Sequence, residues 1–436
     1  MTRIFLALFL FYGTIGHSQN VALKPRQNDG KIIWAGSMLD VTKGTIITDV
    51  LVVVENGAII KIDSASQKDR YKGEDIIDLS DHTILPGLID CHSHLTNPSF
   101  DGTIDVYELP IASYGILGTV YAKQTLQAGF TTVRDVGGYL YSDVALRDAI
   151  NNDWVVGPRM YVSGKAITMT GGHGAWGNWM APHLELEPNP GNPVDGEVEV
   201  RKLARTLIKN GVDLLKINAT GGFGTANSIP GAASFTIDEM KAAVNEARKR
   251  GIRVAAHAHG ADGIKNAVRA GVNSIEHGTF LDQESIDLMI ENEVYLVMDL
   301  LAAHVSLLEN KDDISKKAID KGNQKVYDDY AINFNEAYQK GVKMAFGTDA
   351  SIFEHGRNAK QFHLMVKAGM KEMDAIRSAT TVAAELIGIE KTTGSIEEGK
   401  WADIIAVKGN LLNDITVLEK VDFVMKDGKV YKTPKK

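Results

Sequence analysis

The central part of the chain alternates short apolar runs with longer stretches whose apolar residues recur at helical spacing. Helices are expected at 198–209, 237–250 and 263–270, each ending near a glycine that can serve as a C-terminal cap. Repeated strand-then-helix units over about 250 to 300 residues favour an α/β fold, a closed (β/α)8 TIM barrel, over a doubly wound sheet. Eight strands are predicted, at 83–89, 131–136, 159–163, 214–217, 253–257, 274–277, 295–298 and 343–348.

Both ends of the chain instead show β-branched runs separated by turn residues. Residues 46–54 and 58–62 flank Asn56-Gly57, a strong hairpin signal. Similar runs occupy 402–407 and 421–425. The two ends are therefore expected to pair into one small β-sandwich. The predicted division is 27–85 and 386–436 for the two parts of the sandwich and 86–385 for the barrel.

The first residues form a segment of their own. Arg3 precedes an apolar run at 4–12, and small and polar residues follow up to Asn20. This order is typical of a secretory signal peptide, and the run is well short of the about 20 apolar residues that a membrane anchor needs. We therefore expect residues 1–18 to be a signal peptide and the protein to be periplasmic or secreted, with no membrane anchor.

Composition excludes several other classes of protein. The 436 residues are 44% apolar and 23% charged, which suits one large barrel and a smaller domain. The formal net charge of −8 gives no general attraction to nucleic acid. Cys91 is the single cysteine, so no intramolecular disulfide can form. Association into a homo-oligomer stays open.

Residues able to bind a metal stand at the ends of the predicted strands. His92 and His94 follow the first strand, His257 and His277 end the fifth and sixth, and Asp349 follows the eighth. The C-terminal ends of barrel strands meet on one face, so these side chains are expected to converge. An isolated histidine such as His257 or His277 is more often a core or surface residue than a ligand, and a single His-x-His pair is a weak signal. Together they indicate a metal site.

Lys216 lies inside the apolar strand predicted at 214–217. It could be an ion-paired lysine whose stem extends to the rim of the barrel. Alternatively, burial lowers its pKa, and the amine reacts with carbon dioxide to give a carbamate that can bridge two cations. Asp349 could cap a helix, but at a strand end it is better interpreted as a metal ligand and general base.

The motifs GLIDCHSHL, VRDVGG, LLKINATGGFGT, VAAHAHG, SIEHG, FGTDA and GSIEEGKWADIIAV together resemble the amidohydrolase superfamily. LLKI…TGGFGT, VAAHAHG and HGRNAKQF are most similar to the zinc-dependent Xaa-Pro dipeptidase and arginine carboxypeptidase group, to which ochratoxinase-type amidases are related. Imidazolonepropionase-like relatives resemble the chain less at HGRNAKQF.

This resemblance implies a binuclear zinc site. His92, His94 and Asp349 would hold one Zn²⁺, His257 and His277 the other, and N6-carboxylated Lys216 would bridge both. Asp349 would also take a proton from the attacking water and pass it to the leaving amine.

Further residues are candidates for substrate binding and catalysis. His173, in a long loop after the third strand, can hydrogen-bond the scissile carbonyl or a substrate carboxylate, or have no role. His259 faces the side of His257 or caps the next helix. His355 and Arg357 can meet a free carboxylate or lie on the surface.

Two residues near these positions are expected to have structural rather than catalytic roles. Arg134 is expected to pair with its neighbour Asp135 rather than with substrate. Cys91 lies between Asp90 and His92 and is expected to pack in the core rather than act as a nucleophile.

The sequence leaves three functions to distinguish. The first is a secreted or periplasmic metal-dependent amidohydrolase that cleaves the last amide bond of a dipeptide, short peptide or N-acyl amino acid. The second is an imidazolonepropionase-like hydrolase of cyclic amides. The third is a non-catalytic binding barrel, against which the six candidate ligands argue, because a binding protein needs no general base beside a metal pair.

Overall fold

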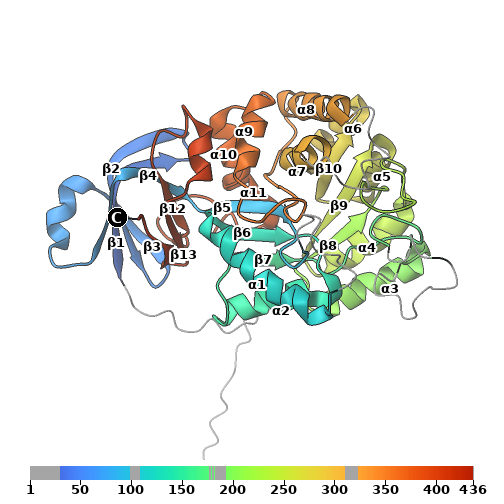
Figure 1. Cartoon of the computed structure of the whole chain (residues 1–436), viewed down its shortest axis with the longest axis horizontal. Coiled ribbons are helices and arrows are strands. Elements are labelled where there is room, and N and C mark those ends of the chain that lie inside the picture. The colour runs from blue at the N-terminus through green and yellow to red at the C-terminus, as the bar shows by residue number, and fades with distance from the viewer. Residues whose placement is uncertain are drawn as a thin grey trace, which may run out of the picture.

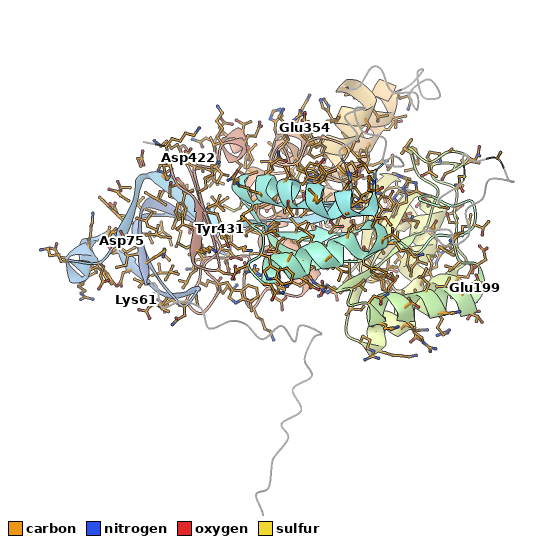
Figure 2. The ribbon with its side chains drawn as sticks, turned by 60° about the horizontal axis from the view of Figure 1, so that its bottom comes forward. Lys61, Asp75, Glu199, Glu354, Asp422 and Tyr431 are labelled. Atoms are coloured by element: carbon orange, nitrogen blue, oxygen red, sulfur yellow. The ribbon has the colours of Figure 1, made fainter. Side chains whose placement is uncertain are left out.

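The structure is a computed structural model that describes residues 30–98, 109–175, 178, 181, 193–309 and 323–435. The predicted signal peptide lies outside these residues. A sheet built from both chain ends adjoins a larger α/β part (Figure 1). Lys61 and Asp75 lie on the sheet part, and Glu199 lies at the opposite end of the molecule (Figure 2). No helix in the described ranges combines the length and apolar character that crossing a membrane requires.

Strands from both ends of the chain pair into one mixed sheet of seven strands, in the order β14-β13-β12-β4-β1-β2-β3. Its members are β1 (Lys31–Asp40), β2 (Thr45–Glu55), β3 (Ala58–Ser64), β4 (Ile76–Pro86), β12 (Ile404–Val407), β13 (Phe423–Lys426) and β14 (Lys429–Lys432). The predicted pairing of the two ends is thus present, because β4 from the first half lies antiparallel beside β12 from the second.

The strands of both chain ends form one sheet whose hydrogen bonding is continuous from edge to edge, rather than two separately bonded sheets. The β2–β3 turn uses Asn56 and Gly57 in the left-handed region, with φ of 51° and 77°, as the hairpin signal predicts. After this turn Ala58 bridges back to Trp401, just before β12. An apolar core lies against this sheet, and both chain ends contribute residues to it.

The α/β part contains seven parallel strands in two hydrogen-bonded groups, β5-β6-β7 and β8-β9-β10-β11. Single bridges join the groups: Ile167 pairs with Ile217, Leu296 with Met344, and Ala350 with Ser93. They close a ring, the arrangement expected of a TIM barrel. The strands are β5 (Leu88–Ser93), β6 (Phe130–Asp135), β7 (Arg159–Val162), β8 (Leu214–Asn218), β9 (Arg253–Gly260), β10 (Ser274–Phe280) and β11 (Tyr295–Val297).

Helices surround these strands (Figure 1). They are α1 (Ile111–Gln127), α2 (Ser142–Asn151), α3 (Gly196–Lys209), α4 (Ile237–Lys249), α5 (Ala261–Ala270), α6 (Gln283–Glu291), α7 (Leu300–His304), α8 (Asn323–Gln339), α9 (Lys360–Lys367), α10 (Glu372–Ser378) and α11 (Thr381–Ile387). The three helices predicted by periodicity are present within two residues of their expected ends. Thr236 and Glu239 form a capping box at α4, and Gly271 ends α5 in the left-handed conformation.

Two predicted strands differ from the structure. The strand expected at 83–89 is divided at Gly87, because β4 before it pairs with β12 and β5 after it pairs with β6. A Cβ at Gly87 would stand 2.2 Å from Oγ1 of Thr131, so only glycine fits at this change of sheet. The strand expected at 343–348 forms only the Met344 bridge. Its amides bond to different partners: Ala345 to the carbonyl of Leu296 in β11, Phe346 to that of Ser378, and Thr348 to that of His92 in β5.

A buried ion network joins the α/β part to the sheet. The guanidinium of Arg159, at the start of β7, lies 2.7 Å from Asp403 and 2.5 Å from Asp427, and it stacks 4.0 Å from the ring centroid of Trp401. Asp403 is almost fully buried. The two carboxylates belong to the sheet part, so this network fixes the two parts together.

Arg159→Met is expected to lower the free energy of unfolding by about 3 kcal/mol, since it leaves Asp403 as a buried unpaired charge. Denaturant unfolding followed by circular dichroism measures the effect. Arg205→Met is the matched control, because Arg205 is largely exposed and its pair with Glu246 should contribute far less to stability. Equal losses in the two variants would contradict the structural role of Arg159.

Candidate metal centre

The first three predicted ligands lie together. Nε2 of His92 and Nε2 of His94 are 3.4 Å and 3.1 Å from Oδ1 of Asp349. His92 lies in β5 and His94 directly follows its end, and Asp349 reaches them because its amide bonds to the carbonyl of His92 at 2.8 Å. One ligand atom from each residue falls within 4.8 Å of the others, a spacing suited to a single cation.

A second cluster joins the first at the ends of β9 and β10. One nitrogen from each of His257, His259 and His277 lies within the same 4.8 Å limit. The ring of His277 also stands 4.9 Å from that of His92, so the two clusters adjoin. His259 was predicted to face the side of His257 or to cap the next helix. The structure places it beside the two predicted ligands His257 and His277.

Two of the clustered residues have unusual backbone conformations. His277 and Asp349 adopt φ of 73° and 55°, in the left-handed region that non-glycine residues rarely occupy. Such conformations cost of order 1–3 kcal/mol each and concentrate at functional sites. The fold holds both residues at these angles, and both present their side chains to the clusters.

Lys216 is buried in β8, which runs beside β9 in the ring. Burial lowers the pKa of its ammonium to about 8, and the nearby carboxylates of Glu276 and Asp349 only partly oppose that effect. At neutral to mildly alkaline pH a useful fraction of this side chain is therefore the amine. This protonation state is the one that carbamate formation needs.

Burial and charge act in opposite directions on Asp349. Burial raises the pKa of the carboxyl group, but the neighbouring imidazoles of His92 and His94 outweigh it and lower the pKa well below the usual range. Asp349 is therefore ionised and able to bind a cation or accept a proton.

Glu276 is a site residue that the sequence reasoning missed. It is fully buried in β10, with Oε2 3.0 Å from Nδ1 of His92 and both oxygens within 2.9 Å of Nη2 of Arg134. Burial raises the pKa of Glu276, but Arg134 and then His92 lower it below the usual range, so it is ionised. An ionised carboxylate only accepts, so Nδ1 of His92 carries the proton and Nε2 is left for a metal.

The same contact corrects the interpretation of Arg134. It was expected to pair with Asp135, but adjacent residues of a strand point to opposite faces, and its partner is Glu276. Asp135 instead accepts hydrogen bonds from the amides of Leu95 and Gly137. The visible signal for Glu276 was a charged residue in the apolar run directly before His277.

A hydrogen-bonded group ties β5 to the segment that bears Asp349. Asp90 accepts from the hydroxyl of Thr348 at 2.6 Å and from the side chain of Asn358 at 2.7 Å. Its Oδ1 also accepts from the amide of His92 at 3.0 Å. Asn358 belongs to the HGRNAKQF motif, and this contact gives the motif a role in fixing the first cluster.

His173 lies against the second cluster. Its ring stacks 4.3 Å from that of His257 at an interplanar angle of 15°, and its Nδ1 lies 2.9 Å from the hydroxyl of Thr225. Burial lowers the pKa of His173 to about 4, and the charge of His277 adds to the effect, so the ring is neutral at pH 7. The structure thus brings His173 to the site.

The other two substrate candidates are placed differently. His355 is buried, and its ring stacks on Tyr121 of α1 at 4.5 Å. Arg357 lies toward the surface, with Nη1 2.6 Å from Glu354. Of the two alternatives left open for Arg357, these contacts favour the surface position. Cys91 is buried in the core, as expected.

His355→Phe is expected to stabilise the protein increasingly as pH falls from about 7 to about 4. Both ring nitrogens of His355 are buried without a partner among the described residues. Burial lowers its pKa to about 3, with a smaller effect of His94. An unfolded histidine binds its proton near the ordinary value of 6.5, so acid favours the unfolded wild type and not the variant.

Thermal midpoints of both proteins across this pH range measure the difference. A constant difference would contradict the neutral buried state of His355. In a separate measurement, a large rise in KM in His355→Phe would support the predicted contact of His355 with the substrate.

The chemistry of the donor set fits divalent metal ions. Within the described ranges, Nε2 of His257 is buried and has no hydrogen-bond partner, although it lies among other imidazoles. A Cβ at Gly222 would stand only 2.7 Å from this nitrogen, so glycine keeps its surroundings open. Imidazole and carboxylate donors are the ligands that Zn²⁺ accepts.

Comparison with known proteins decides the family. The sequence pattern of the amidohydrolase family matches residues 83–431. The chain belongs to the amidohydrolase family. The crystal structure of a Xaa-Pro dipeptidase with bound methionine in the active site is 41% identical, with a TM-score of 0.86, and covers 92% of this chain and 100% of that one.

Two curated relatives extend the comparison. Ochratoxinase from Aspergillus niger is 33% identical over 375 residues, which are 80% of this chain and 76% of that protein. Imidazolonepropionase from Rhizobium rhizogenes is 24% identical over 407 residues, 82% of this chain and 86% of that protein. This amidohydrolase is accordingly a metal-dependent hydrolase that acts on C–N bonds, with histidine-rich candidate sites for divalent metals.

Proposed function

We propose that this amidohydrolase cleaves the C-terminal amide bond of dipeptides, short peptides or N-acyl amino acids. The observation that carries the proposal is the convergence of five predicted ligand side chains near buried Lys216, in a chain 41% identical to a Xaa-Pro dipeptidase. A substrate with a free carboxylate needs a donor at the site, and of the predicted substrate residues His173 and His259 lie there.

We further propose that the site holds two Zn²⁺ ions. His92, His94 and Asp349 would hold one, His257 and His277 the other, and carboxylated Lys216 would bridge them. Supporting this are the two adjoining clusters and the lowered pKa of Lys216. Bound metals lower the pKa of water and polarise a carbonyl.

The side chains of this protein would then divide the proton transfers. Asp349 is ionised, so it can accept the proton of the attacking water and deliver it to the leaving amine. His173 is neutral, and because its Nδ1 is engaged with Thr225, Nε2 remains to contact the substrate carbonyl or carboxylate. Glu276 keeps His92 in the tautomer that faces the metal.

Location and partners complete the proposal. The apolar segment after Arg3 supports a secreted or periplasmic protein. Its partners would be small peptide or acyl-amino-acid substrates rather than nucleic acid, to which the net charge of −8 gives no general attraction.

A dipeptide library tests the function. The zinc-loaded protein is incubated with dipeptides of varied C-terminal residue, N-acyl amino acids and cyclic amides, and products are identified by mass spectrometry. Release of a free C-terminal amino acid, lost in Asp349→Asn, is the expected result. Turnover of cyclic amides alone would replace the proposal by the imidazolonepropionase-like function, and turnover of nothing would favour a binding barrel.

A further inference from the structure

The orientation of His277 depends on a tyrosine from a distant helix. Nδ1 of His277 lies 3.0 Å from Oδ1 of Asp299, just beyond β11. The hydroxyl of Tyr330, in the middle of α8, lies 2.7 Å from the same oxygen and accepts a hydrogen bond from the amide of Asp299 at 3.1 Å. Both partners of His277 are buried. The three side chains thus form a continuous chain from α8 to the second cluster.

The same helix supports the strained backbone at the end of β10. The hydroxyl of Tyr330 lies 3.0 Å from the carbonyl of His277, whose φ is 73°. One turn later, the side chain of Asn333 donates to the carbonyl of Thr279 at 2.8 Å. The hydroxyl of Thr279 in turn lies 2.7 Å from Nδ1 of His259. α8 therefore contacts the segment that orients two of the three imidazoles in this cluster.

These contacts determine which nitrogen of His277 faces the cluster. A carboxylate only accepts, so Asp299 accepts a hydrogen bond from Nδ1–H of His277, and the lone pair of Nε2 is left for a metal. Tyr330 occupies the oxygen that receives this bond, and so limits the rotation of Asp299. Loss of the hydroxyl would remove a hydrogen bond that holds Oδ1 of Asp299 in place against Nδ1 of His277.

We propose that Tyr330, acting through Asp299, is a positioning residue for His277, and that α8 thereby sets the affinity of the second metal position. The inference rests on the proposed function, because it assumes that His257 and His277 hold a metal. The first position, formed by His92, His94 and Asp349, has its own support from Glu276 and Gly137.

Tyr330→Phe tests the proposal, with Tyr338→Phe as its control. Tyr338 lies on the same helix and also bonds a carboxylate, Asp374, at 2.6 Å, but its partner is on α10 and not at the site. Equilibrium competition between each zinc-loaded protein and a chromophoric chelator measures the affinity of each bound ion. We expect Tyr330→Phe to keep one ion at wild-type affinity and to hold the other about 10- to 100-fold more weakly, with Tyr338→Phe unchanged.

The outcomes separate this inference from the proposed function. Two ions held as tightly by Tyr330→Phe as by the wild type would overturn the inference alone, and so would equal weakening of both ions. A wild-type protein that binds no zinc would overturn the proposed function itself. Asp299→Asn provides a second variant if Tyr330→Phe does not fold. It keeps an oxygen acceptor but removes the charge, and the same selective weakening of one ion is expected.

Discussion

Asp349→Asn is expected to lower kcat on a cleaved dipeptide by about 10²- to 10⁴-fold, the range for loss of a positioned general base. The amide keeps the size of the side chain and its contacts near His92 and His94, but it cannot take a proton from water. Steady-state rates together with zinc content measure the effect. Zinc content separates loss of the base from loss of a ligand, since only the second changes the number of bound ions.

Asp374→Asn is the matched control for this substitution. Asp374 accepts hydrogen bonds from Tyr338 and Arg377 outside the site, so its loss should leave kcat within a factor of about two of the wild type and affect only stability. A kcat for Asp349→Asn within tenfold of the wild type, with zinc retained, would contradict its role as the base.

Lys216→Ala is expected to remove at least one zinc ion and to lower activity by roughly 10³-fold, because several kcal/mol of metal stabilisation are lost and each 1.36 kcal/mol is tenfold. The alanine side chain leaves space where a carbamate would stand. A short carboxylic acid added at high concentration should therefore restore part of the activity, since its two oxygens can replace those of the carbamate.

Lys426→Met is the matched control, because it removes a buried lysine that lies outside the metal centre. Burial lowers the pKa of Lys426 to about 8 as well, but its ammonium donates to the carbonyl of Gly157 at the contact between the two parts of the molecule. Its loss should reduce stability and leave two zinc ions in place. Full activity of Lys216→Ala, or no response to added carboxylate, would argue against the bridging carbamate.

The sequence could predict those features that local spacing encodes. His92 and His94 are two residues apart at the end of a strand, and Asn56-Gly57 requires two left-handed residues, so both features follow from a few neighbouring positions. The positions of His257 and His277 followed from the rhythm of strands. These parts of the fold and site depend on periodicity rather than on distant contacts.

The supporting residues could not be predicted in this way. Glu276 meets Arg134, 142 residues earlier in the chain, and Tyr330 meets Asp299 from a helix 31 residues later. Nothing in the local sequence marks either pair. Arg134 was assigned to its neighbour Asp135 because sequence proximity suggested a contact, whereas strand geometry sends the two side chains to opposite faces.

The segment before Asp349 also differs from the sequence prediction. An apolar run predicted a regular strand there, but Gly347 packs against His92 and Asp349 turns into the left-handed region. The ligand position is thus made by leaving regular strand geometry, and an apolar pattern contains no information about that turn.

The metal content of the purified protein tests the central claim most directly. Protein produced with zinc in the medium, freed of loosely bound ions and measured by elemental mass spectrometry, should contain about two zinc ions per chain. Lys216→Ala prepared in parallel should contain one or none. A folded wild-type protein with close to zero bound metal, and with unchanged activity in the presence of a strong chelator, would contradict the account.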